Sequence, residues 1–126
     1  MRIVLAMALA FFLLHTNAKA NEMGHDISYY DGETELEGYW ISSQCNASKA
    51  EPLIIIIPQW KGISAHEKDV GEKLAWKCNN VLIADMYGKG IRPKNNVEAA
   101  TESAKYKNNP SLGRQRITAA LNFGKE

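Results

Sequence analysis

Two unbroken aliphatic runs in the middle of this chain are separated by a segment of different period. Residues 53–57 read LIIII, and residues 81–84 read VLIA. Aliphatic runs without polar alternation are typical of strands that helices cover on both faces. We therefore expect residues 53–57 to form an interior strand of a parallel sheet, with residues 81–84 as a second buried strand.

The segment between the two runs changes to a helical period. Ser64 followed by Glu67 matches a capping box, and apolar residues then recur on one face as far as Cys78. We expect this helix to stop at residue 79 or 80. A strand, a helix and a strand in a connection of this length predict a right-handed crossover with parallel pairing, so the fold class is α/β.

A hairpin is predicted on the amino-terminal side of this unit. Asp31-Gly32 lies between two stretches of β-favouring residues, which is a hairpin signal, with strands expected at 27–30 and 35–42. Such a sheet is small, and one side of 53–57 or of 81–84 lacks a neighbouring strand. The pattern therefore predicts an apolar open edge.

Two helices are predicted after the second run. The first starts at residue 95 or 96, beyond a glycine-containing loop, and ends by 109–110. The second starts near Ser111 and carries Ile117, Ala120 and Leu121 on one face. The chain therefore ends in a helix, where a parallel α/β unit would ordinarily return to its sheet.

The first twenty residues have the pattern of a secretory signal peptide. Arg2 precedes the apolar run IVLAMALAFFLL, and small residues in AKA occupy the positions that a signal peptidase reads. The alternative, a membrane anchor, needs about 20 apolar residues, more than this run has. We expect cleavage after Ala20, export to the periplasm or the medium, and one mature domain over 21–126.

Charge gives no reason to expect a nucleic-acid or membrane partner. Removal of residues 1–20 takes away Arg2 and Lys19 and changes the formal charge from +1 to −1. A near-neutral chain with mixed signs lacks the basic surface that phosphate-rich partners require. No motif for a cofactor or metal is present, and His25 beside Asp26 does not make a metal site.

Two cysteines, Cys45 and Cys78, admit two interpretations. In an oxidising compartment they can form a disulfide. Alternatively, Cys78 is a small buried hydrophobe on the apolar face of the predicted helix. Neither cysteine lies in a CxxC or Cys/His cluster. The sequence leaves the choice between disulfide and free thiol open.

Several motifs in register resemble the amino-terminal half of the dienelactone hydrolase family of α/β-hydrolases. The resemblance covers nearly the whole of 21–126, and its motifs are a hairpin, a strand followed by a polar turn, a helix and a second strand with its loop. The matching residues are Gly38-Tyr39, Pro58-Gln59-Trp60-Lys61-Gly62, Asp69, Leu74-Ala75 and Ala84-Asp85-Met86-Tyr87-Gly88.

The resemblance implies a partial α/β-hydrolase sheet and a role for the turn after residues 53–57. In α/β-hydrolases this turn donates a backbone N–H to the oxyanion hole, and by position that donor is Trp60. Trp60 as an ordinary core or lid aromatic is the alternative. The neighbouring Gln59 stands where the family has a glutamate that helps control a nucleophilic thiol, and a glutamine cannot carry that charge.

The resemblance also implies that no catalytic residue lies in this chain. The family's nucleophile, Asp and His all follow the matched region, and neither Gly-x-Cys-x-Gly nor Gly-x-Ser-x-Gly occurs here. We interpret Ser64 as a helix cap, His66 as a solvated side chain, and Asp85 as a partner of local backbone.

Two functions follow from this resemblance. The first is hydrolysis of a small ester or lactone by nucleophilic acyl transfer, in which case this truncated chain is inactive alone and needs a complementing carboxyl-terminal half. The second is a non-catalytic secreted binding module on a partial hydrolase scaffold, with the open edge and aromatics such as Tyr39, Trp40 and Trp60 as its contact surface.

Overall fold

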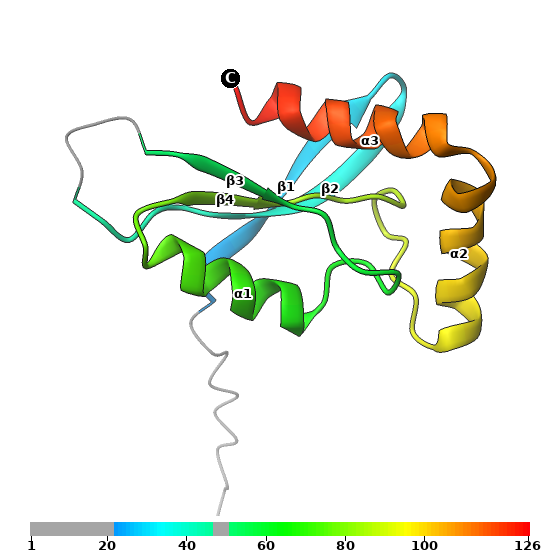
Figure 1. Cartoon of the computed structure of the whole chain (residues 1–126), viewed down its shortest axis with the longest axis horizontal. Helices are drawn as coiled ribbons and strands as arrows, with labels where there is room; N and C mark the ends of the chain where they lie inside the picture. The colour runs from blue at the N-terminus through cyan, green and yellow to red at the C-terminus, as the bar shows by residue number, and fades with distance from the viewer. Residues whose placement is uncertain (1–21, 47–50) are drawn as a thin grey trace, which may run out of the picture.

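A computed structural model describes residues 22–46 and 51–126, so the predicted signal peptide lies outside the described residues. In chain order the structure contains strands and helices with these bounds: β1 Gly24–Asp31, β2 Thr34–Ile41, β3 Leu53–Ile56, α1 Ala65–Ala75, β4 Asn80–Ile83, α2 Asn96–Asn108 and α3 Pro110–Phe123. Figure 1 shows the sheet between α3 and α1, with α2 beyond the end where β3 and β4 leave the sheet.

The strands form one mixed sheet in the order β1-β2-β4-β3. β3 and β4 pair in parallel, with Leu53 opposite Asn80 and Ile56 opposite Ile83. The other two pairings, β1 with β2 and β2 with β4, are antiparallel. The α/β class and the parallel pairing across a helix are therefore confirmed, and both parallel strands point their carboxyl ends toward α2 (Figure 1).

The predicted hairpin is confirmed, and its strands are longer than expected. β1 and β2 pair from Gly24 opposite Ile41 to Asp31 opposite Thr34. Gly32 has φ 60 at the first position of the connecting turn, where two-residue hairpins of type II′ require glycine. The hydrophobic pattern did not predict a strand at residues 24–26, which lack apolar side chains. These residues nevertheless pair with residues 39–41 of β2.

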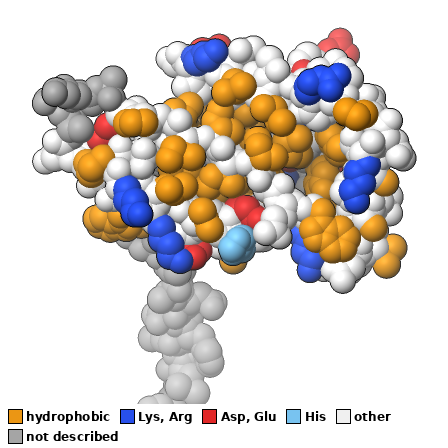
Figure 2. Space-filling model, viewed as in Figure 1, with side chains coloured by type: hydrophobic (Ala, Val, Ile, Leu, Met, Phe, Trp, Pro, Cys, Tyr) orange, Lys and Arg blue, Asp and Glu red, His pale blue; other side chains and the backbone are white. Residues whose placement is uncertain are grey.

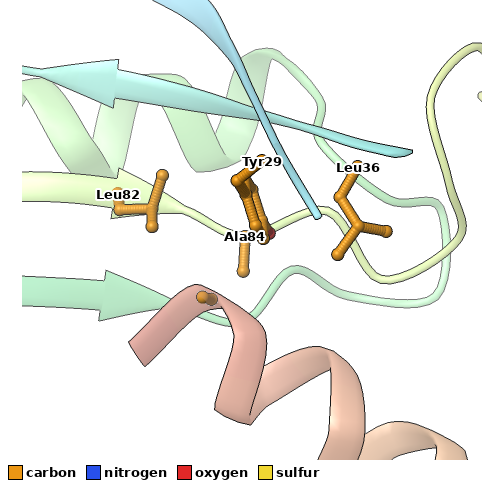
Figure 3. Packing of buried hydrophobic residues seen from close by; sticks show 5 residues of the cluster. Tyr29, Leu36, Leu82 and Ala84 are labelled. Atoms are coloured by element: carbon orange, nitrogen blue, oxygen red, sulfur yellow. The ribbon is translucent and has the colours of Figure 1, made fainter. Parts of the chain in front are cut away.

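The sheet buries side chains on both faces because residues alternate along each strand. On one face Leu82 and Ala84 pack with Tyr29, Leu36 and α3, as Figure 3 shows. The opposite face, against α1, is formed by these residues: Tyr39, Ile41, Val81, Ile83 and Ala75. All of the residues named here are nearly inaccessible to water, so these two clusters are the core. The expectation that Tyr39 is part of an exposed contact surface is therefore wrong.

Helix α1 begins where the sequence predicts and ends earlier. Ser64 and Glu67 form the capping box. The last helical residue is Ala75, not residue 79 or 80. Cys78 follows with φ 63, and its N–H donates to the Ala75 carbonyl at 3.2 Å. A left-handed residue just past a helix turns the chain away, so the interpretation of Cys78 as a helix-face hydrophobe is wrong.

The expectation that residues 53–57 form an interior strand is also wrong. In the part of the chain that the structure describes, β3 pairs with β4 alone, and its residues are only half-buried. Ile57 lies beyond the strand and is 44% exposed. The prediction of an apolar open edge is confirmed, and it falls on β3. Figure 2 shows hydrophobic side chains on the surface between α3 and α1.

Helices α2 and α3 are confirmed, each with an asparagine cap. The Asn95 side chain accepts from the Glu98 N–H, and the Asn109 side chain accepts from the Leu112 N–H. Ala120 of α3 is buried against the sheet, whereas Leu121 is 43% exposed and does not share that face as predicted. Among the described residues, no helix is long and apolar enough to cross a membrane.

Candidate functional site: the turn at the carboxyl end of β3

The chain leaves β3 through a tight turn over residues 59–62. The Gly62 N–H donates to the Gln59 carbonyl at 2.8 Å, and Gly62 has φ 75. Glycine tolerates this left-handed conformation, which other residues rarely adopt. Pro58 precedes the turn and supplies no N–H, so strand pairing stops before Gln59. The sequence therefore ends the aliphatic run and reverses the chain within a few residues.

This turn fixes the direction of the Trp60 N–H. In a trans peptide the Gln59 carbonyl and the Trp60 N–H point in opposite directions. The carbonyl accepts from Gly62 inside the turn, so the N–H points out of it. Among the described residues, no oxygen accepts a hydrogen bond from the Trp60 N–H. The Trp60 side chain is 42% exposed, and is not a core aromatic.

A second loop, at the end of β4, contacts the turn from the other side. The Tyr87 hydroxyl donates to the Trp60 carbonyl at 2.6 Å. Tyr87 is 8% exposed, and its ring packs against Tyr106 of α2 with centroids 5.5 Å apart. Burial, followed by the nearby Tyr106 and Glu102, raises the pKa of Tyr87. The hydroxyl therefore remains a proton donor at neutral pH.

Asp85 stabilises the loop that carries Tyr87. Its carboxylate is buried and accepts from the N–H groups of Tyr87 at 2.9 Å, Gly88 at 3.2 Å and Glu37 of β2 at 2.9 Å. Arg92 Nη1 lies 3.6 Å from the same carboxylate. The expectation that Asp85 bonds local backbone is confirmed, because its carboxylate satisfies buried amides.

Beneath the turn, the first residues of α1 line a polar cleft with Gln59, Trp60 and Lys61. Glu67 is 4% exposed, and it accepts from the Ser64 N–H at 3.0 Å and from the Ser64 hydroxyl. Burial raises the pKa of this carboxyl, but hydrogen bonds from Ser64 and from the N–H groups of Glu67, Ser64 and Gln59 outweigh it and lower the pKa.

Ser64 and His66 do not form a nucleophile and base. The Ser64 hydroxyl donates to Glu67 and accepts from the His66 N–H at 3.2 Å, which are capping bonds. The His66 side chain is exposed. Ser64 as a cap and His66 as a solvated histidine are thus confirmed.

An apolar pocket of about 190 Å³ opens next to the turn. It lies between the β3 and β4 loops and α2. The residues that line it are Ile57, Pro58, Gln59, Trp60, Met86, Tyr87, Ser103, Tyr106 and Lys107. Trp60, whose N–H has no acceptor among the described residues, is one of the lining residues. This pocket and the turn at the carboxyl end of β3 together form the candidate site.

The two cysteines take no part in this site. Cys45 and Cys78 are joined in a disulfide, with Cα atoms 5.0 Å apart, and neither sulfur is a free thiol. The bridge ties the segment after β2 to the turn after α1, where Gln44 N–H also donates to the Ala75 carbonyl at 3.0 Å. Over residues 22–46 and 51–126, no cluster of His, Cys, Asp and Glu could hold a metal ion.

A family model, described as "Dienelactone hydrolase family", matches residues 36–126, which is most of the chain. The chain belongs to the dienelactone hydrolase family. The match begins in β2 and includes the β3 turn, α1, the β4 loop and both carboxyl-terminal helices. The candidate site therefore lies wholly within the part that this family shares.

Solved structures with the same fold carry names from this family. One is a dienelactone hydrolase-like promiscuous phosphotriesterase from metagenomic libraries, at 24% identity and a TM-score of 0.71. Another, named m3DLH, has 21% identity and a TM-score of 0.72. In each case the similarity covers 79% of this chain and 41% of the other chain. No curated protein matches this chain.

This chain therefore spans less than half the length of those similar structures, and they share its partial α/β-hydrolase fold. The sequence predicted a role for Trp60 and Gln59 but did not predict Tyr87 and Glu67 as contacts of the same turn. Glu67 was visible in the sequence as part of the capping box, and Tyr87 as part of the Asp85-Met86-Tyr87-Gly88 motif. Neither motif by itself shows that both side chains converge on one turn.

Proposed function

We propose that this chain is the amino-terminal part of an exported dienelactone hydrolase-like enzyme that cleaves a small ester or lactone by nucleophilic acyl transfer. In this proposal the Trp60 N–H stabilises the oxyanion that forms during acyl transfer. The observation that carries it is the Trp60 N–H at the carboxyl end of β3, which points out of the turn and has no acceptor in residues 22–46 and 51–126. A preorganised backbone donor costs no reorganisation when charge develops on the substrate oxygen.

The proposal assigns the nucleophile, Asp and His to a carboxyl-terminal segment that this sequence does not contain. Both cysteines are bonded to each other, and no nucleophile-elbow motif occurs. The edge of β3 suits the addition of a further strand, because its isoleucines are half-buried and no described strand other than β4 pairs with it. We propose that the missing segment pairs there and that this chain alone is inactive.

Export completes the proposal. Residues 1–20 have a signal-peptide pattern, and a disulfide between Cys45 and Cys78 suits an oxidising compartment. The substrate in this proposal is a small ester or lactone. The proposal includes no nucleic-acid or membrane partner for the protein. Phosphotriester cleavage, named for one similar structure, is a second substrate class to assay, because it also places developing charge on an oxygen.

The coding sequence beyond the Glu126 codon tests where the missing segment lies. The proposal expects, in any frame, a strand followed by Gly-x-Cys-x-Gly or Gly-x-Ser-x-Gly and later an Asp and a His. Coexpression of that segment with this chain should give ester hydrolysis. A purified pair that associates and does not hydrolyse esters would contradict the proposal.

A pair of variants at Trp60 then tests the oxyanion role. Trp60→Pro removes the N–H at a turn position where proline is favoured, and Trp60→Phe keeps it. Loss of one oxyanion donor lowers kcat by about 10²- to 10³-fold. We expect that loss for Trp60→Pro and less than about a tenth of it for Trp60→Phe. Equal kcat for the two variants would remove Trp60 from the mechanism.

A non-catalytic binding module is the second candidate. Ile57 is 44% exposed and Trp60 is 42% exposed, beside the open edge of β3, and exposed edges and aromatics suit recognition. A chain that stays monomeric and binds no dye for exposed hydrophobic groups would favour this function. Dye binding by the chain that a carboxyl-terminal segment abolishes would favour the hydrolase.

A further inference from the structure

Tyr87 is buried between α2 and the turn after β3. Its ring lies between Tyr106 of α2 and the turn after β3, where Gly62 would place a Cβ 3.7 Å from the ring. Its backbone is held by the bond from its N–H to Asp85 at 2.9 Å. Both the ring and the main chain of Tyr87 are therefore fixed, so its hydroxyl has a defined position.

That hydroxyl holds the central peptide of the turn. In the turn over 59–62 the peptide between Trp60 and Lys61 is central, and the common turn types differ by rotation of this unit. The Tyr87 hydroxyl donates to the Trp60 carbonyl at 2.6 Å and blocks that rotation. The preceding peptide is held by the bond from Gly62 to Gln59 at 2.8 Å. Both peptides that flank the Trp60 Cα are thus fixed.

We propose that Tyr87 is a positioning residue, whose hydroxyl bond to the Trp60 carbonyl keeps the Trp60 N–H directed into the site. This inference rests on the proposed function, in which that N–H is an oxyanion donor. Without the bond, the central peptide is free to rotate, which loosens the turn and weakens the Gly62–Gln59 bond that sets the direction of the Trp60 N–H. A donor that moves by about 1 Å loses much of its value in catalysis.

The direct test is Tyr87→Phe in the full chain, which removes the hydroxyl and keeps the ring. The Lys61 amide shares a peptide with the Trp60 carbonyl, so its nitrogen and proton NMR shifts report on this bond. We expect the Lys61 amide signal to move and the Gly62 N–H to exchange with water about tenfold faster. Tyr30→Phe is the matched control, because Tyr30 is 62% exposed.

A Lys61 signal that moves no more in Tyr87→Phe than in Tyr30→Phe would overturn the proposal. A second measurement uses the unaltered chain and does not depend on folding of the variant. The Tyr87 hydroxyl proton should exchange slowly enough to give an NMR signal with a nuclear Overhauser contact to Trp60 or Lys61. Rapid exchange of this proton with water would equally overturn it.

The enzyme completed with its carboxyl-terminal segment gives the catalytic readout. Tyr87→Phe should lower kcat about tenfold and leave KM within about twofold, because the oxyanion forms after substrate binding. A change in KM with constant kcat would contradict the role of Tyr87 as a positioning residue. If the completed protein hydrolyses no ester, the proposed function fails, while the Lys61 signal still decides whether Tyr87 fixes the turn.

Discussion

Removal of the Asp85 carboxylate should destabilise the chain more than any single change at its surface. The change is Asp85→Ala in the full chain. The carboxylate is buried and accepts three backbone hydrogen bonds, of which those from Tyr87 and Gly88 are buried and that from Glu37 is partly buried. Alanine leaves all three N–H groups without this acceptor.

The size of the effect follows from these amides. A buried donor left unsatisfied costs about 1–3 kcal/mol, and two of them give about 2–6 kcal/mol. The Arg92 side chain is 33% exposed, so water can hydrate it after the change. We therefore expect a loss of about 3–4 kcal/mol in the free energy of unfolding. That is a large fraction of the 5–15 kcal/mol typical of a domain.

Urea denaturation, followed by tryptophan fluorescence and circular dichroism, measures this loss. With a slope of about 1–3 kcal/mol per molar urea, the midpoint should fall by about 2 M. Asp85→Asn keeps one acceptor oxygen and should lose about half as much. Asp69→Ala is the control, because its carboxylate is exposed and pairs with Lys73 at 2.6 Å, a contact worth less than about 0.5 kcal/mol.

A cost of less than about 1 kcal/mol for Asp85→Ala, or a cost no greater than that of Asp69→Ala, would contradict this prediction. Either result would mean that water or a rearranged loop satisfies the amides of Tyr87 and Gly88. A reduced slope would instead indicate loss of cooperative unfolding, and the comparison would then use hydrogen exchange at those two amides.

Three further predictions concern the covalent link, a buried acid and the contact of α3. Reduction of the Cys45–Cys78 bridge, which spans 33 residues, should cost about 3–4 kcal/mol in unfolding free energy, and a double serine variant should be insensitive to reductant. Since the folded pKa of Glu67 is lowered, its stabilisation is present above its ordinary value of 4.5 and is lost as pH falls through the folded value. Glu67→Gln should therefore be less stable than the parent near neutral pH, with a difference that shrinks in acid; a constant difference in pH-dependent urea titrations would contradict this. Ala120→Asp places a charge in the core and should unfold the chain, whereas Leu121→Asp, at a residue 43% exposed, should lower the free energy of unfolding by less than about 1 kcal/mol; equal circular dichroism melts would count against the placement of α3.

Local signals predicted much of this fold correctly. The hairpin followed from Asp31-Gly32, the start of α1 from its capping box, and the parallel pair from two aliphatic runs around a helix. Each of these features depends on residues close together in sequence. The end of α1 was predicted too late because the left-handed conformation of Cys78 carries no clear sequence signal.

The burial of β3 and the partners of the site were not predictable in the same way. The aliphatic run at 53–57 was interpreted as covered on both sides, but the described chain supplies a neighbour on one side only. The bond between Tyr87 and Trp60 joins residues 27 positions apart, and it exists because α2 and the β4 loop place the tyrosine ring beside the turn. Such contacts follow from the packed structure, not from spacing.

Hydrolysis of 4-nitrophenyl acetate by the purified chain, alone and with its carboxyl-terminal segment, tests whether the chain needs that segment for activity and whether the Trp60 N–H acts as oxyanion donor. We expect no turnover above background for the chain alone, and turnover by the associated pair whose kcat Trp60→Pro lowers by about 10²- to 10³-fold and Trp60→Phe largely retains. Turnover by the chain alone, lost in His66→Ala, would contradict the account. So would a pair that associates and remains inactive, which would leave the binding module as the function.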